Sequence, residues 1–273
     1  MNLVVVREVS CKSALSRCGI EGIDYSVNPY IGCEHGCIYC YARYMRYYSG
    51  HRETWGDFID VKINAPLVLS RELYRKPRGR VILSTVTDPY QPLERRYQLT
   101  RSCLKRLLHH DFPVSVMTKS SLILRDIDLL TRFTSCEVGM TVITDDDGLR
   151  SFLEPKASPI DERLDALRRL ADRGIVTYAF VGPIIPSLND GEEDLRRLIR
   201  RLIDVGVDYL MFDRLNTRYG VVDRLSGFLK RRFPHLLKEF MKKIKLGDYY
   251  YRKIKYRVSK IMAEYDVPYE FCF

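Results

Sequence analysis

Three cysteines in one short segment are the residues whose type and spacing point most directly to chemistry. Cys33, Cys37 and Cys40 are separated by three residues and then by two. Thiolates bind zinc or iron, and a four-iron cluster is normally held by four of them. Three thiolates would leave one iron without a protein ligand, free to bind a substrate or a cofactor. Gly32 and Gly36 allow the tight turns that bring a backbone close to inorganic sulfide.

Other interpretations of the same cysteines are open from the residues alone. Zinc could take the three thiolates with His35 as a fourth, tetrahedral ligand, which would make the chain a zinc-stabilised nucleic-acid-binding module. A cluster without a further cofactor would make it an iron–sulfur electron carrier or sensor. Cysteines that only pack in a core form a third interpretation, which the flanking glycines disfavour.

The string Asn28-Pro-Tyr-Ile-Gly-Cys-Glu-His-Gly-Cys-Ile-Tyr-Cys-Tyr-Ala-Arg43 resembles the cluster loop of radical S-adenosylmethionine (SAM) enzymes. It is most similar to the spore photoproduct lyase-like branch, often labelled "DNA repair photolyase"-related. The resemblance implies two cofactors, SAM and a [4Fe-4S] cluster on Cys33, Cys37 and Cys40. It also implies reductive cleavage of SAM to a 5′-deoxyadenosyl radical that abstracts hydrogen from a substrate. Ferredoxin or flavodoxin is the implied electron donor.

Further blocks resemble the same family in the same order. They are Thr87-Asp-Pro-Tyr-Gln-Pro-Leu-Glu94, Thr118-Lys-Ser120, Glu154-Pro155 and Arg163-Leu164. By position, the resemblance implies that Thr87, Lys119 and Thr141 surround the methionyl part of SAM. A cation beside a hydroxyl would suit its carboxylate. The remaining implied cofactor contacts are Glu154 and Arg163 to ribose or carboxylate, the backbone of Tyr39 to adenine, and Gly182 at the floor of the site.

The return of a hydrogen atom after the radical step is a separate expectation. The resemblance ties tyrosines beside the last cluster cysteine to this step, which makes Tyr41 a candidate catalytic residue. The hydrogen-donating cysteine of spore photoproduct lyase aligns with Thr85 or a neighbour, where this chain has no cysteine. We therefore do not expect thymine-dimer reversal by that route. Cys103 and Cys136 lie on apolar faces and should be core residues, which leaves Cys272 as the spare thiol and second candidate catalytic residue.

Composition limits the class of protein. The chain has 273 residues, 46% hydrophobic and 29% charged, as expected of one globular domain. The start Met1-Asn-Leu-Val-Val-Val-Arg-Glu8 has no basic leader, and no apolar run reaches the roughly 18 residues that a membrane helix needs. We expect a cytoplasmic protein that does not bind membranes, with Cys11 and Cys18 unpaired. Glutamine occurs only at Gln91 and Gln98, which favours a thermophilic source.

The net charge of +10 favours a polyanionic partner such as nucleic acid. The run Tyr249-Tyr-Tyr-Arg-Lys-Ile-Lys-Tyr256 mixes aromatic residues with cations, as surfaces that bind single strands do. The alternative is the solvated face of a helix that packs on the rest of the chain.

The elements that must position these residues alternate regularly. Strands are expected at 25–29, 80–86, 114–117, 136–143, 175–181 and 207–212, with an accessory strand at 58–63. Helices are expected at 39–48, 65–74, 100–110, 125–133, 159–172 and 191–205. This order predicts an α/β fold, a partial (β/α)6 barrel, with functional groups at the C-terminal ends of its strands. The predicted organisation is an N-terminal extension (1–24), the barrel (25–221) and C-terminal helices packed on it (222–273).

Overall fold

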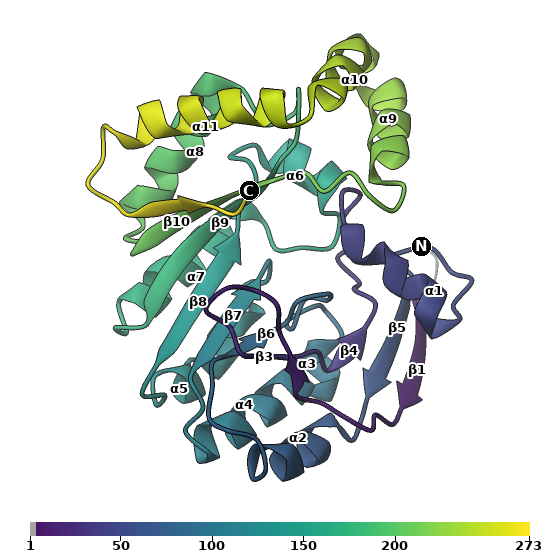
Figure 1. Ribbon diagram of the computed structural model, residues 1–273, viewed down its shortest axis with the longest axis vertical. Helices are drawn as coiled ribbons and strands as arrows, with labels where there is room; N and C mark the ends of the chain where they lie inside the picture. The colour runs from purple at the N-terminus through teal and green to yellow at the C-terminus, as the bar shows by residue number, and fades with distance from the viewer. Residues whose placement is uncertain (1–3) are drawn as a thin grey trace.

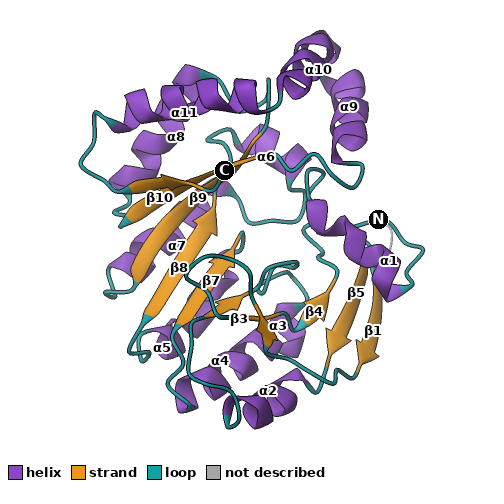
Figure 2. Cartoon of the chain, in the orientation of Figure 1, coloured by secondary structure: helices purple, strands orange, loops and turns teal. Residues whose placement is uncertain are grey.

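The computed structural model describes residues 4–273, and its central feature is a curved eight-stranded sheet (Figures 1 and 2). The strand order is β11-β10-β9-β8-β7-β6-β3-β2, in which the six strands from β3 to β10 are parallel. The sheet stays open at β11 and β2, so the predicted partial barrel of six β–α units is confirmed. The strands are β2 (Ser16–Arg17), β3 (Tyr25–Val27), β6 (Val81–Leu83), β7 (Val114–Thr118), β8 (Cys136–Thr141), β9 (Val176–Ile184), β10 (Tyr209–Arg214) and β11 (Tyr269–Phe271).

Helices on the outer face of this sheet connect its strands. In α7 the residues Leu164, Leu167 and Leu170 recur at helical spacing and are buried, so this face packs on the sheet. Two short helices follow strand ends: α3 (Glu94–Tyr97) and α6 (Asp147–Leu153), whose first turn is capped by the Asp146 carboxylate. The longer connecting helices are α2 (Ala65–Leu73), α4 (Leu99–His109), α7 (Ile160–Ala171) and α8 (Glu192–Asp204).

A second sheet of three strands lies beside the open barrel (Figure 1). Its order is β1 (Val5–Val9), β5 (Phe58–Lys62) and β4 (Tyr30–Ile31). The predicted N-terminal extension, 1–24, therefore supplies one strand to each sheet, β1 to this one and β2 to the barrel. Residues 1–3 of that extension lie outside the described range. The second sheet matters for function because β4 leads directly into the segment that carries the three cysteines.

The C-terminal segment contains the expected helices, α9 (Val221–Arg232), α10 (Leu237–Leu246) and α11 (Asp248–Met262). It also contains β11, which pairs in parallel with β10 at the sheet edge and was not part of the predicted helical extension at 222–273. Lys243 and the Tyr250 hydroxyl both bond to Asp190, at 2.7 and 2.6 Å, and so hold these helices to the segment after β9. The domain boundaries themselves stay a prediction.

Two helix predictions need correction. The helix expected at 39–48 is a 3₁₀ turn, η1 (Tyr41–Tyr44), followed by α1 (Met45–Ser49), which ends at Gly50 with a φ of 67°. Only α5 (Ile127–Leu130) of the helix expected at 125–133 is α-helical, after a 3₁₀ segment, η2 (Ser121–Asp126). There the Arg125 guanidinium bonds both Glu94 and Asp126, which holds the chain in a tighter turn.

Two of the remaining cysteines lie in the core as expected: Cys103 is fully buried, and Cys136 packs against the main core. Cys11 and Cys18 are half-buried. None of the helices within residues 4–273 is both long enough and apolar enough to span a membrane.

Candidate functional site

The three-cysteine segment forms a compact loop between β4 and η1. Gly32 has a φ of 89°, and a Cβ there would lie 2.3 Å from the Phe58 carbonyl oxygen. Gly36 has a φ of 62° and packs against Gly56, where an added Cβ would lie 2.9 Å from the Gly36 Cα. Gly32 therefore has no room for a side chain, and the positive φ of Gly36 is a conformation that residues other than glycine rarely adopt. The predicted tight turns at Gly32 and Gly36 are confirmed.

Cys33 and Cys37 are buried and Cys40 is half-buried, and the three thiols are close enough to affect one another's titration. Burial, with smaller contributions from Asp88 and Cys40, raises the pKa of Cys33 to about 12. Burial also raises the pKa values of Cys37 and Cys40, against the opposing effect of Lys119. Binding of a metal must displace these protons, so the thiols become thiolates only with a cation in place.

The donors available near the loop are the three cysteines and His35. Within residues 4–273, no three or more His, Cys, Asp and Glu side chains are placed to hold one metal ion. Thiolates around a cluster are spaced farther apart than ligands of one ion, because iron and sulfide lie between them. His35, the fourth ligand of the zinc interpretation, is buried with its Nδ1 3.3 Å from the Asp88 carboxylate.

Hydrogen bonds hold the cysteine loop against the segment that follows β6. The Asn28 side-chain oxygen accepts the N–H of Thr85 at 3.0 Å, and the Thr87 hydroxyl donates to the Gly32 carbonyl at 2.6 Å. Thr87 therefore positions the loop, and its contact with SAM stays a prediction. Asn28 belongs to the cysteine-loop motif, and its role in holding the loop follows from this contact.

Lys119 lies between polar side chains from neighbouring strand ends, Thr141 and Asp88. Its Nζ is 3.5 Å from the Thr141 hydroxyl, as expected for neighbouring parallel strands that end at one edge. Its backbone N–H donates to Asp88 at 2.8 Å. Burial would lower the pKa of Lys119, but Cys37, Glu154 and Asp88 outweigh it and raise the pKa above its usual value. A cation therefore stands beside the cysteine loop at the C-terminal edge of the sheet.

Glu154 and Arg163 form a buried ion pair beneath that cation. Their charged atoms lie 2.5 Å apart, and neither side chain has exposed surface. The Tyr39 hydroxyl donates to Glu154, and Arg163 donates to the Thr141 carbonyl at 2.8 Å. The pair thus links the cysteine loop to β8. Its predicted contact with SAM stays a prediction, since in this arrangement the polar atoms face other protein groups.

The rim of the sheet carries the other candidates. Tyr41 is 39% exposed, with its hydroxyl 3.4 Å from the Thr85 carbonyl. The backbone N–H of Cys272 donates to the Phe212 carbonyl on β10, and Cys272 as a whole is an exposed residue. Burial, with Asp213 and Glu270, raises the pKa of the Cys272 thiol to about 11. This thiol therefore stays protonated at neutral pH.

Asp213 is a rim residue that the sequence analysis missed. Burial raises the pKa of its carboxyl to about 6. Gly182 makes room for it, because a Cβ there would lie 2.3 Å from the Phe180 ring and 3.0 Å from the Asp213 Cβ. An acidic residue at the C-terminal end of an apolar strand was the available signal, but the strand was expected to end one residue earlier.

Known proteins support the same interpretation of the chain. The family model described as Radical SAM superfamily matches residues 27–212. An uncharacterized protein of Methanocaldococcus jannaschii is 37% identical over 190 residues, 69% of this chain and 71% of that protein. The Radical SAM Nalpha-GlyT isomerase of Pseudomonas phage M6 is 27% identical over 216 residues, 78% of this chain and 44% of that protein. A spore photoproduct lyase variant, solved with AdoMet and dinucleoside spore photoproduct, has the same fold, with a TM-score of 0.70. The two are 16% identical in sequence, and the match covers 99% of this chain and 82% of that one.

Proposed function

Because the chain belongs to the radical SAM superfamily, whose enzymes use a [4Fe-4S] cluster and SAM, we propose that Cys33, Cys37 and Cys40 hold the cluster. The observation that carries the proposal is the glycine-shaped loop of three thiols beside the Lys119 cation. When bound, the cluster and SAM would supply a 5′-deoxyadenosyl radical, formed by reductive cleavage, that abstracts hydrogen from the substrate. The protein's own part is to bind, orient and shield these groups.

Lys119 is the residue that we assign to the carboxylate of SAM. Its ammonium group lies 3.5 Å from the Thr141 hydroxyl, so one cation and one hydroxyl can bind the two carboxylate oxygens. A hydrogen bond to a charged group is stronger than a neutral one. Asp88 holds the Lys119 backbone. The other proposed cofactor contacts are those of Thr87, Glu154, Arg163, Gly182 and the backbone of Tyr39.

Tyr41 and Cys272 are the proposed carriers for hydrogen return. Both lie at the rim of the sheet, and the Cys272 thiol keeps its proton at neutral pH. A protonated thiol can give up a hydrogen atom, whereas a thiolate has none to give. The position at which spore photoproduct lyase is expected to have its cysteine is here near Thr85, which lies close to the Tyr41 hydroxyl.

Nucleic acid is the proposed substrate class. The support is the net charge of +10 and the fold shared with spore photoproduct lyase, which has been solved with a dinucleoside spore photoproduct. An iron–sulfur electron carrier or sensor is the second candidate, because the cysteine loop alone would serve it. A carrier needs no cation placed to receive SAM, and Lys119 favours the enzyme.

The test is anaerobic reconstitution with iron and sulfide, followed by SAM and dithionite. We expect 5′-deoxyadenosine to form, with a faster rate when the DNA or RNA substrate is present and with ferredoxin or flavodoxin able to replace dithionite. A protein that is reduced but forms no 5′-deoxyadenosine would be a carrier. Purification with one zinc and no iron would instead support the zinc-stabilised binding module.

A further inference from the structure

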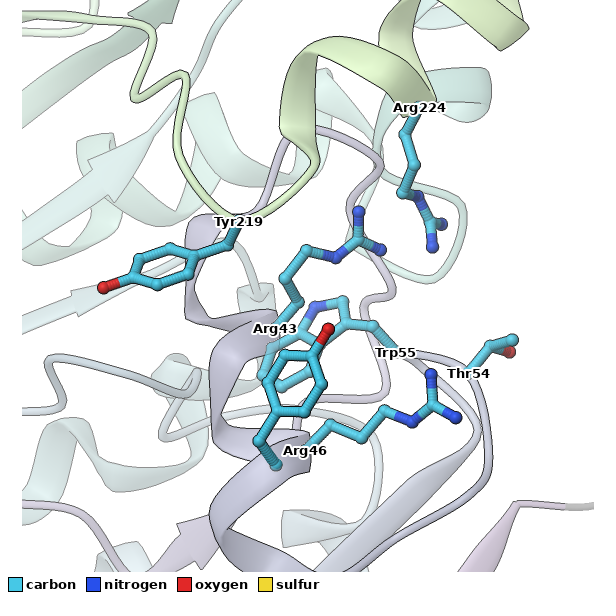
Figure 3. A pocket seen from close by; sticks show the side chains of 7 residues that line it. Arg43, Arg46, Thr54, Trp55, Tyr219 and Arg224 are labelled. Carbon is cyan, nitrogen blue, oxygen red and sulfur yellow. The ribbon is translucent and has the colours of Figure 1, made fainter.

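A charged hollow of about 210 Å³ opens next to the cysteine loop, outside the groups assigned above (Figure 3). Three arginines and three aromatic residues line it together with Thr54. They are Arg43, Arg46, Tyr47, Trp55, Tyr219 and Arg224. Figure 3 shows the guanidinium groups of Arg43 and Arg224 side by side, although they come from η1 and from the first turn of α9.

A strained turn positions Tyr219 and Arg224, two of the residues that line this hollow. Tyr219 and Gly220 both adopt left-handed backbone conformations, with φ of 57° and 72°. This conformation is unfavourable for a tyrosine, so surrounding contacts must hold it. The Tyr219 ring packs on Tyr44 with centroids 4.9 Å apart, which fixes the start of α9 against the helix that follows the cysteine loop. The hollow is therefore built by the fold rather than left by mobile surface chains.

The arginines of the hollow lack acidic partners. The side chains of Arg43 and Arg224 make no hydrogen bond or ion pair with any group in residues 4–273, and the Arg46 side chain donates only to the His51 and Arg52 carbonyls. Burial, and then repulsion by Arg224, lowers the pKa of Arg43 to about 10. Asp57 is the carboxylate that acts on Arg224, but its side chain accepts from Thr54 instead.

The chemistry of this lining selects one kind of ligand. Guanidinium groups bind phosphate oxygens in pairs of parallel hydrogen bonds, and several of them converge where a phosphate is recognised. Tyr47 is 81% exposed at its edge, where a sugar or a base could stack on it. A hollow of about 210 Å³ has room for a phosphate group with part of its ester.

We propose that the hollow between Arg43, Arg46 and Arg224 binds a phosphate group, supplied by the backbone of a nucleic-acid strand. Only the source of the phosphate rests on the proposed function. Arg43 follows Cys40 by three residues, so a strand held here would pass beside the cluster loop. This surface is separate from the Tyr249–Tyr256 segment, because α11 and α1 lie well apart in Figure 1.

Trp55 gives a direct test, because it is the single tryptophan of the chain and lines the hollow. Its fluorescence would be followed while the full-length protein is titrated with a ten-nucleotide thymidine strand, thymidine 5′-monophosphate or inorganic phosphate. We expect saturable binding of the strand, weakened about tenfold or more by Arg224→Gln and by Arg43→Gln. Arg231→Gln, on the exposed side of the same helix, should bind as the parent does.

Comparison of the thymidine strand, thymidine 5′-monophosphate and inorganic phosphate shows which molecule supplies the phosphate group. Tighter binding of the strand supports a nucleic-acid backbone, and equal binding of the monophosphate keeps the phosphate site but assigns it to a small ligand. No change in Trp55 emission with any probe would overturn the proposal, as would equal weakening by Arg231→Gln. The assay needs no SAM cleavage, so failure of the radical assignment would leave its outcome unaffected.

Discussion

The Nη2 atom of Arg163 lies 2.5 Å from the Oε2 atom of Glu154, in two side chains that have no exposed surface. The pair joins α7 to the end of α6, and Tyr39 extends it into the cysteine loop. Burial would raise the pKa of Glu154, but Arg163 and Lys119 hold it below its usual value. The carboxylate is therefore charged and depends on its partners.

Glu154→Gln should destabilise the protein strongly. The substitution leaves the Arg163 charge buried without a counter-ion, and breaking such a pair typically costs about 3–5 kcal/mol. Urea unfolding of the parent and the variant measures the loss. Arg169→Gln is the control on α7, the helix that carries Arg163, since its pair with Asp165 spans 3.7 Å and is about half exposed. The control should lose at most about 1 kcal/mol. Equal losses in the two variants would contradict the positioning role of Glu154.

Lys119→Ala should weaken SAM binding while leaving the iron content unchanged. Loss of a hydrogen bond to a charged group costs about 1.5–3 kcal/mol, roughly a ten- to hundredfold change in affinity. Anaerobic calorimetric titration of the reconstituted protein with SAM measures it. Lys105→Ala, an exposed cation on α4, is the control. Unchanged affinity in Lys119→Ala would remove Lys119 from the cofactor site.

The Cys272 thiol should react slowly with iodoacetamide at neutral pH. Its pKa is raised to about 11 by burial, Asp213 and Glu270, so the reactive thiolate fraction should grow about tenfold per pH unit between pH 7 and 10. Peptide mapping by mass spectrometry isolates this cysteine from the others. Asp213→Asn should speed alkylation by removing a nearby negative charge. A rate independent of pH would indicate a thiolate and argue against hydrogen-atom donation.

The α11 surface should contribute to the salt dependence of nucleic-acid binding. Arg252 and Lys253 lie over the Tyr249 ring, whereas Lys255 turns away to the Phe273 carbonyl and leaves the surface expected from the sequence. The informative triple variant therefore replaces Arg252, Lys253 and Lys260. It should reduce the slope of log affinity against log salt by up to about three units. Replacing the exposed cations Lys238, Lys242 and Lys245 of α10 removes the same charge, and an equal reduction there would mean that α11 is no specific contact surface.

Local patterns predicted the fold and the cysteine loop because both depend on short-range signals. Helical and strand periodicity located the six β–α units, and parallel strand ends brought Lys119 and Thr141 together as expected. The strand at Tyr269–Phe271 was missed because three residues carry no periodicity and its partner is distant in sequence.

The long-range charge pairs of the site could not be predicted from the sequence either. The resemblance assigned Glu154 and Arg163 to the cofactor and did not predict that the two side chains are buried against each other. Their contact with SAM stays a prediction. Charged residues are rarely buried, and nothing in a sequence states which few of them will pair. Arg43 and Arg224 meet for the same reason, through a turn at Tyr219 that has no local signature.

The central claim is that Cys33, Cys37 and Cys40 hold a cluster that cleaves SAM. Iron content and 5′-deoxyadenosine formation would be measured together after anaerobic reconstitution of the parent, Cys37→Ala and, as control, Cys18→Ser outside the loop. We predict about four irons per chain and 5′-deoxyadenosine for the parent and the control, with both lost in Cys37→Ala. A Cys37→Ala variant that keeps its iron and forms 5′-deoxyadenosine at the parent's rate would contradict the assignment.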